Sequence, residues 1–184
     1  MKRIIVLSFA LISSCLVFAQ SAHLLFNNKP VDGQLTDFVQ AVKAEGINYV
    51  GTQDSKATLK GNFYGFNNSV AEVYATQQGL VYSVILNLES KSSWEDLQKD
   101  YNQMKSLLTG QYGQPADVVE HFIAEGGDAA AKMTDVTTGA YAWHCTFITK
   151  EGNVTLSIAA ENNAKGFVTV NFVDKANVAA MRKK

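Results

Sequence analysis

Apolar residues recur at two different periods along this chain, and the period predicts where the helices lie. A first amphipathic helix is predicted over 34–45 by four apolar residues at steps of three and four: Leu35, Phe38, Val39 and Val42. A second opens at Ser92-Ser93, where Ser92 with Glu95 and Ser93 with Asp96 both resemble capping boxes, and closes at Gly110. Its buried stripe is predicted to be Trp94, Leu97, Tyr101, Met104 and Leu108. Both stripes are narrow, so each helix is expected to bury one face.

Between and after these helices, apolar and polar residues alternate as they do in half-buried strands. The first half of the chain predicts strands at 48–52, 57–64, 70–76 and 80–88, and the second half at 140–149, 153–160 and 166–173. The short links between them favour antiparallel hairpins. Three further segments follow other patterns: one or two helical turns at 116–124, a long excursion at 125–139 with one helical turn at 128–133, and a short terminal helix at 174–182.

This order of elements predicts an α+β fold. The two halves resemble each other, since each has a helix followed by three or four hairpin strands. We therefore expect tandem α-β-β-β repeats at about 24–90 and 91–176, with the helices on one face of the sheet. Residues 20–184 are expected to form a single domain, because about 165 residues is an ordinary domain size.

The start of the chain has the layout of a secretory signal peptide. A basic Met1-Lys2-Arg3 precedes an apolar run over 4–18 and the small residue Ala19. Cleavage near Ala19 would leave a periplasmic or secreted protein. In an alternative interpretation Cys15 ends a lipobox and anchors an outer-membrane lipoprotein, but the apolar residues after it favour cleavage at Ala19.

Composition limits the partners that this protein can have. Without Lys2 and Arg3 the chain has 14 basic and 17 acidic residues, a formal net charge of −3. Nucleic acid is not expected as a partner, because phosphate binding needs clustered Lys and Arg. The apolar run at 4–18 is shorter than a membrane span, and no later segment approaches that length. Once Cys15 is removed, Cys145 has no partner for an internal disulfide.

Several segments carry a resemblance to known proteins. They are the stretch FNNKPVDG at 26–33, the series from Trp94 to the YGQP turn at 112–115, and FVD at 172–174 with Asn177. Together they resemble a group of small exported, uncharacterised proteins of Gram-negative gut-type bacteria, which implies no catalytic residues. The turn after the second helix is also similar in layout to the repeats of β-lactamase-inhibitor-protein and outer-membrane-assembly small-lipoprotein folds, which implies protein binding by a sheet face or a loop.

The chain lacks the common signatures of catalysis and metal binding. His144 and Cys145 are neighbours on a predicted strand and so point to opposite faces, which keeps them from forming a Cys–His pair. His23, His121 and His144 stand far apart and in no metal-ligand spacing. We therefore predict no catalytic residue, no metal and no cofactor. Paired carboxylates for hydrolysis stay open as an alternative, since Asp54, Glu72, Glu161 and Asp174 could meet in space.

The remaining candidate site is the sheet face turned away from the helices. Alternation places Tyr64, Tyr74 and His144 on this outward face. Tyrosine is enriched at interfaces, although it is also favoured on plain sheet surfaces. We expect an exported, non-enzymatic binding or envelope-accessory protein whose partner is another envelope protein. The alternatives are a hydrolase of envelope polysaccharide or peptide and a carrier of a small apolar ligand.

Overall fold

The computed structural model describes residues 23–124 and 126–181. The predicted signal peptide, its cleavage site and Cys15 lie outside these residues. The described chain folds into strands and helices in this order: β1 (Leu25–Phe26), β2 (Lys29–Pro30), α1 (Leu35–Lys43), β3 (Asn48–Gln53), β4 (Lys56–Phe63), β5 (Phe66–Ala75), β6 (Val81–Asn87), α2 (Trp94–Tyr112), β7 (Asp117–Phe122), α3 (Ala129–Thr138), β8 (Tyr141–Ile148), β9 (Gly152–Asn162), β10 (Lys165–Asp174) and α4 (Lys175–Met181).

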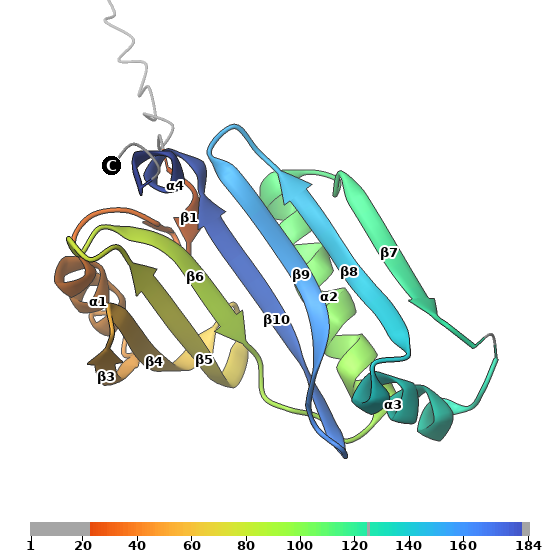
Figure 1. The fold of residues 1–184 in the computed structure, drawn as a ribbon. Coiled ribbons are helices and arrows are strands. Elements are labelled where there is room, and N and C mark those ends of the chain that lie inside the picture. The colour runs from red at the N-terminus through yellow and green to blue at the C-terminus, as the bar shows by residue number, and fades with distance from the viewer. Residues whose placement is uncertain (1–22, 125, 182–184) are drawn as a thin grey trace, which may run out of the picture.

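Eight of the strands form one sheet in the order β3-β4-β5-β6-β10-β9-β8-β7, and β1 and β2 form a separate hairpin (Figure 1). Neighbouring strands of the large sheet run antiparallel. The predicted α+β class is thus confirmed. The chain runs α1-β3-β4-β5-β6 and then α2-β7-α3-β8-β9-β10, and the two runs meet where β6 pairs with β10.

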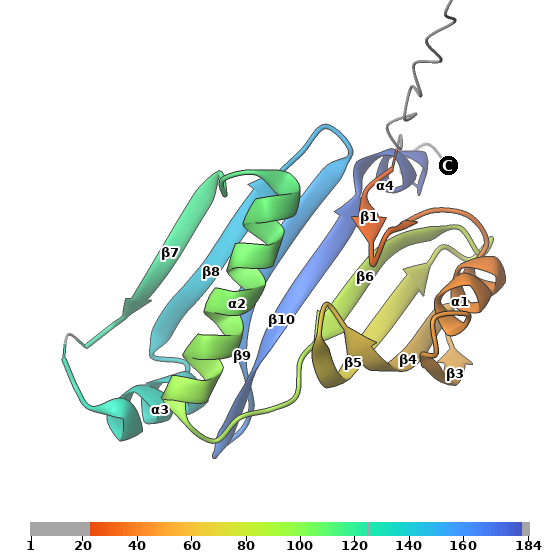
Figure 2. The same ribbon diagram turned by 180° about the vertical axis from the view of Figure 1, so that it is seen from behind.

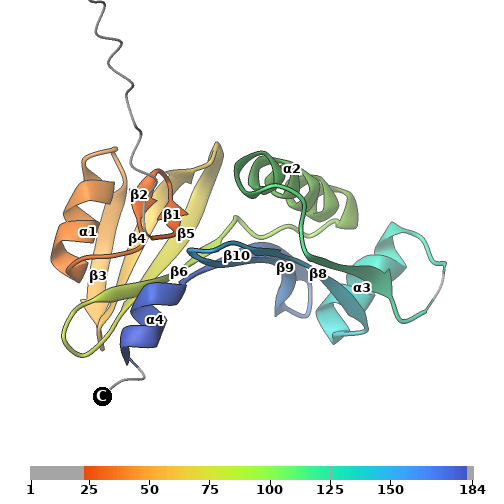
Figure 3. The same ribbon diagram turned by 90° about the horizontal axis from the view of Figure 1, so that it is seen from above.

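The sequence analysis expected all the helices on one face of the sheet, but the structure places them on both sides. α1 and α2 cover one face, as Figures 2 and 3 show. α3 reaches the same face, because a Cβ placed at Gly166 of β10 would meet both Val136 of α3 and Leu97 of α2. The short α4 follows β10 directly and turns to the opposite side of the sheet (Figure 3).

The predicted stripe of α2 is the part of the helix that is buried. Trp94, Leu97, Tyr101, Met104 and Leu108 are all at most 3% exposed. Ser93 caps the helix by accepting a hydrogen bond from the backbone of Asp96, as the capping pattern predicts. Burial of such side chains contributes about 1.5–3 kcal/mol each, so this stripe anchors α2 to β8, β9 and β10.

A second part of the core is aromatic and lies under the β1–β2 hairpin. The fully buried ring of Phe26 contacts Phe38 of α1, Phe63 of β4 and Phe172 of β10, with ring centroids 5.3–6.5 Å apart. These rings come from four separate elements. They therefore fix the hairpin and α1 onto the middle of the sheet.

Two predicted segments differ from the structure. Residues 117–122 form β7, not helical turns, because Val118, Val119 and Phe122 pair with β8 at the edge of the sheet. The excursion contains α3, longer than the single turn expected, with Asp128 as its N-cap and Gly139 in the left-handed conformation at its end. Among the described helices, none combines the length and the apolar character that a membrane span requires.

Candidate functional site

The face of the sheet opposite α1 and α2, here called the open face, is built by strand register. Its middle row takes one side chain from each of seven strands, namely Thr58, Glu72, Ile85, Asn171, Thr155, Thr146 and Asp117. Figure 1 looks onto this face. α4 borders it at one end, where Val173 and Ile148 share a hollow with Val178. The row is mostly polar and half-buried, as expected for a sheet face in contact with water.

Tyr74 lies on the open face, as predicted, in a compact group with Lys56 and Glu72. The Tyr74 hydroxyl donates to Glu72 Oε2 at 2.8 Å, and Lys56 Nζ lies 2.6 Å from Glu72 Oε1 and 5.9 Å from the Tyr74 ring centroid. The hydrogen bond from Lys56 lowers the pKa of Glu72. Burial, together with the bond to Glu72, raises the pKa of Tyr74 to about 12. Tyr74 is thus a fixed hydrogen-bonding group and not an acid.

His144 also lies on the open face, as predicted, but far from Tyr74. It stands in the neighbouring row, opposite Ser157, and its Nε2 lies 3.6 Å from Asp117 Oδ2. Tyr74 belongs to β5 and His144 to β8, with three strands between them. Four strand spacings amount to about 19 Å. The two residues therefore share a surface but cannot share one small ligand.

Tyr64 does not lie on the open face. It follows the last residue of β4 with a φ of 55°, so the alternation of the strand no longer applies to it. Its ring stacks on Phe172 at an interplanar angle of 5°, and its hydroxyl accepts a hydrogen bond from the backbone of Asn27 at 2.8 Å. Burial raises the pKa of Tyr64 to about 12. Tyr64 thus packs on the helix side and holds the β1–β2 hairpin.

The open face is hollowed at the end where β6 leaves the sheet. This hollow, here called the Phe167 groove, has a volume of about 650 Å³. Strands β4, β5, β6, β9 and β10 and the loop after β6 supply its lining, in which Val70 and Phe167 are apolar and Lys60, Asn68, Asn87, Glu89 and Glu161 are polar. The sequence analysis missed this groove. Its residues come together only through the strand register, which the sequence does not specify.

A second polar cluster lies beneath α2 on the other face. Glu120 Oε1 accepts hydrogen bonds from the Tyr101 hydroxyl at 2.9 Å and from Lys105 Nζ at 2.6 Å. Burial raises the pKa of the neighbouring Cys145, so its thiol is protonated at neutral pH. As predicted, Cys145 points into the core and His144 away from it. Because these groups satisfy one another, they hold α2 against β7 and β8.

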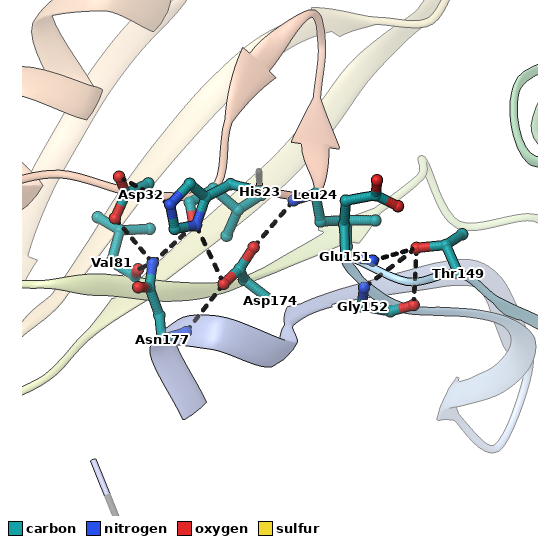
Figure 4. A network of polar contacts seen from close by, with 10 residues as sticks. His23, Leu24, Asp32, Val81, Thr149, Glu151, Gly152, Asp174 and Asn177 are labelled. Carbon is teal, nitrogen blue, oxygen red and sulfur yellow. Dashed lines mark hydrogen bonds and ion pairs between the residues drawn. The ribbon is translucent and has the colours of Figure 1, made fainter. Parts of the chain in front are cut away.

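A third polar network joins the two ends of the described chain, as Figure 4 shows. The carboxylate of Asp174, which is 0% exposed, accepts from the backbone N–H of Leu24 and of Asn177, each at 2.9 Å. His23 lies between two carboxylates, with Nδ1 3.3 Å from Asp174 Oδ1 and Nε2 3.4 Å from Asp32 Oδ2. We call these five residues the terminal latch. Both ring nitrogens of His23 face carboxylates, so neither is placed to act as a general base.

Asn177 ties the latch to the sheet. Its amide nitrogen donates to the backbone oxygens of Val31 and Val81 at 3.1 and 2.9 Å, and to Asp32 Oδ1 at 2.9 Å. Partial burial is the largest single effect and raises the pKa of Asp32, but the hydrogen bonds from Asn177 and the backbone of Gly33, together with the nearby His23, outweigh it and lower the pKa. The latch therefore connects the β1–β2 hairpin, β6 and α4.

The carboxylates considered for hydrolysis do not form one constellation. Glu72 is engaged by Lys56 and Tyr74, and Asp174 belongs to the terminal latch. Glu161 instead lines the Phe167 groove together with Glu89. Across residues 23–124 and 126–181, no group of three or more His, Cys, Asp or Glu side chains is arranged to hold a metal ion.

Comparison with known proteins identifies no similar protein. No family model, no curated protein and no solved structure matches this chain. The resemblance to small exported proteins therefore stays a prediction, and function must be inferred from the surfaces described above.

Proposed function

We propose that this protein is a non-enzymatic binding or envelope-accessory protein that contacts another envelope protein through the open face. One observation carries the proposal: the open face extends over seven strands, and among the described helices only α4 borders it, at one end. A face of this breadth can bury the area of about 800 Å² per partner that a stable interface requires. Tyr74 and His144 are the predicted contacts near its two sides.

The chemistry of the face favours binding over catalysis. Glu72 is held by Lys56 and Tyr74, and His144 lies close to Asp117. Side chains that are already oriented by neighbours lose little entropy when a partner binds. They also supply both donors and acceptors for polar contacts.

The proposal also includes export of the protein to the periplasm or out of the cell. The basic start, the apolar run at 4–18 and Ala19 support export with cleavage near Ala19, and an anchor at Cys15 is the alternative. Secretion or periplasmic location would expose the open face to envelope components.

Each of the two runs begins with a helix and contains four strands, although the second run also contains α3; this order supports a further part of the proposal, that the halves are tandem repeats. The meander β3-β4-β5-β6 and the meander β7-β8-β9-β10 join through their last strands, β6 and β10. Duplication of one unit would produce this order with the two helices on the same face.

A crosslinking pull-down against an envelope extract of the producing organism tests the proposal. The bait is residues 20–184, compared with a double variant in the middle row, Thr155→Arg with Asn171→Arg, whose side chains are cross-strand neighbours. The matched control carries Asn102→Arg and Ser106→Arg on the exposed side of α2. We expect one partner to be captured by the wild type and the control but not by the face variant. Equal capture by all three baits, or capture by none, would contradict the proposal.

The hydrolase alternative keeps one specific observation in its favour. Glu89 and Glu161 line the same groove, and a pair of carboxylates across a groove is the arrangement that glycoside hydrolysis requires. Release of sugar fragments by the wild type, abolished by Glu161→Gln, would replace the binding proposal. The apolar-ligand carrier has less support, because Leu97, Tyr101, Met104 and Leu108 fill the layer between α2 and the sheet.

A further inference from the structure

The Phe167 groove has the size and the mixed lining of a small-ligand site. Its volume of about 650 Å³ lies within the range of about 300–1,000 Å³ that such sites occupy. Val70 on β5 and Phe167 on β10 contribute apolar surface to the open face from the two strands that flank β6. An aromatic ring and a branched aliphatic side chain offer a surface on which the C–H face of a sugar ring can pack.

The polar groups of the groove are held in place before any ligand arrives. The Thr169 hydroxyl donates to Asn87 Oδ1 at 2.7 Å, which orients the Asn87 amide. Asn68 Nδ2 donates to Glu89 Oε1 at 3.0 Å, and Lys91 Nζ lies 3.4 Å from Glu89 Oε2. Because these hydrogen bonds already orient the Asn87 and Glu89 side chains, the side chains lose less conformational entropy when a ligand binds.

These bonds also determine which groups remain for a ligand. The Asn87 amide nitrogen makes no hydrogen bond within the described part of the chain, so its two hydrogens are available. The hydrogen bonds from Asn68 and Lys91 lower the pKa of Glu89, which therefore stays an acceptor at neutral pH. The groove thus offers both donors and acceptors, as vicinal hydroxyls require.

The charge of the lining narrows the class of ligand. The lining contains one cationic side chain, Lys60, and two carboxylates, Glu89 and Glu161. Phosphorylated and other polyanionic ligands need clustered cations and are disfavoured here. A neutral ligand with hydroxyl groups and an apolar ring face matches this lining.

We propose that the Phe167 groove binds a neutral oligosaccharide, packed on Val70 and Phe167 and hydrogen-bonded by Asn87, Glu89 and Glu161. The inference rests on the proposed binding function and assigns it a second ligand, of the kind that an envelope contains. The middle row of the open face remains free for a protein partner, because none of its residues lines the groove.

Nuclear magnetic resonance of the labelled chain, residues 20–184, tests the inference directly. Three neutral probes are titrated to about 10 mM, tenfold above a Kd of 1 mM: chitotetraose, cellotetraose and maltotetraose. With at least one of them, the side-chain amide signals of Asn68 and Asn87 are expected to shift and to saturate. If none of the probes moves either signal, the inference is wrong.

Two variants with matched controls locate the site. Asn87→Asp keeps the acceptor for Thr169 but replaces the free donor by an oxygen, and should weaken binding at least about tenfold, while Asn102→Asp on α2 should not. Phe167→Ala should weaken binding to a similar extent, while Tyr49→Ala on the exposed edge strand should not. Binding that Asn87→Asp leaves unchanged would overturn the assignment, even if Phe167→Ala fails to fold.

The outcomes separate this inference from the proposed function. Partner capture that depends on Thr155 and Asn171, without any sugar-induced shift, would remove the groove assignment alone. Sugar binding without face-dependent capture would remove the protein-binding proposal alone. Cleavage of a probe into fragments would overturn both in favour of hydrolysis by Glu89 and Glu161.

Discussion

Replacement of Asp174 by Asn tests whether the terminal latch stabilises the fold. The two carboxylate oxygens each accept a backbone hydrogen bond, Oδ1 from Asn177 and Oδ2 from Leu24, both at 2.9 Å and fully buried. An amide has the same shape but one oxygen, so one of these N–H groups would face an NH₂ group. The charge that faces His23 would also be lost.

The expected cost follows from these contacts. A buried donor left without an acceptor costs about 1–3 kcal/mol, and the remaining bond loses its charge assistance. Together these effects should lower the free energy of unfolding by about 3 kcal/mol. With a urea m-value of about 2 kcal/mol/M, the midpoint of unfolding should fall by about 1.5 M.

Urea denaturation followed by circular dichroism measures this shift, and hydrogen exchange at Leu24 and Asn177 localises it. One of these two amides should exchange faster in the variant than expected from global unfolding alone. Asp54→Asn is the control, because Asp54 is exposed in a turn with φ of 50°, which Asn also tolerates. A free energy of unfolding for Asp174→Asn within about 0.5 kcal/mol of that of the control would refute the reasoning.

Two further predictions concern the open face and the β9–β10 pair. The pKa of Glu72 is lowered in the folded state, so its stabilising effect is complete above its unfolded pKa of about 4.3 and is lost as pH falls through the folded value. The free energy of unfolding, measured in urea, should therefore fall less between pH 7 and pH 3 for Lys56→Gln than for the wild type. The two falls should differ by less than about 1 kcal/mol. Equal falls would contradict this prediction. Gly152→Ala should destabilise by about 3 kcal/mol or more, because its Cβ would collide with the backbone oxygen of Val173, whereas Gly51→Ala has open space and should change the midpoint little. A Gly152→Ala midpoint equal to that of Gly51→Ala would show that the strand pair moves apart at small cost.

The parts of the fold that the sequence predicts well are those in which one segment carries the whole signal. The five buried residues of α2 recur at helical steps, and Ser93 marks the start of the helix. β7 was missed because 117–122 is an edge strand whose partner, β8, lies beyond α3. A short apolar pattern after a helix does not reveal which of the two periods the next segment follows.

The candidate site was predictable only in part, for a related reason. Alternation along one strand placed Tyr74 and His144 on the open face but failed for Tyr64, where a positive φ turns the chain over. Alternation also cannot specify which strands are neighbours. The Phe167 groove and the distance between Tyr74 and His144 both depend on that order.

The position of β10 has a consequence for how the chain reaches its native state. β10 is synthesised after all the other described strands, yet it lies in the middle of the sheet between β6 and β9. Until residues 165–174 are available, β6 has an unpaired edge, and the hairpin at 25–30 lacks Phe172 and the latch residue Asp174. We therefore expect a chain that ends before residue 165 to expose the unpaired edge of β6 and to aggregate. Folding of the whole chain should be slow, because these contacts join residues that are far apart in the sequence.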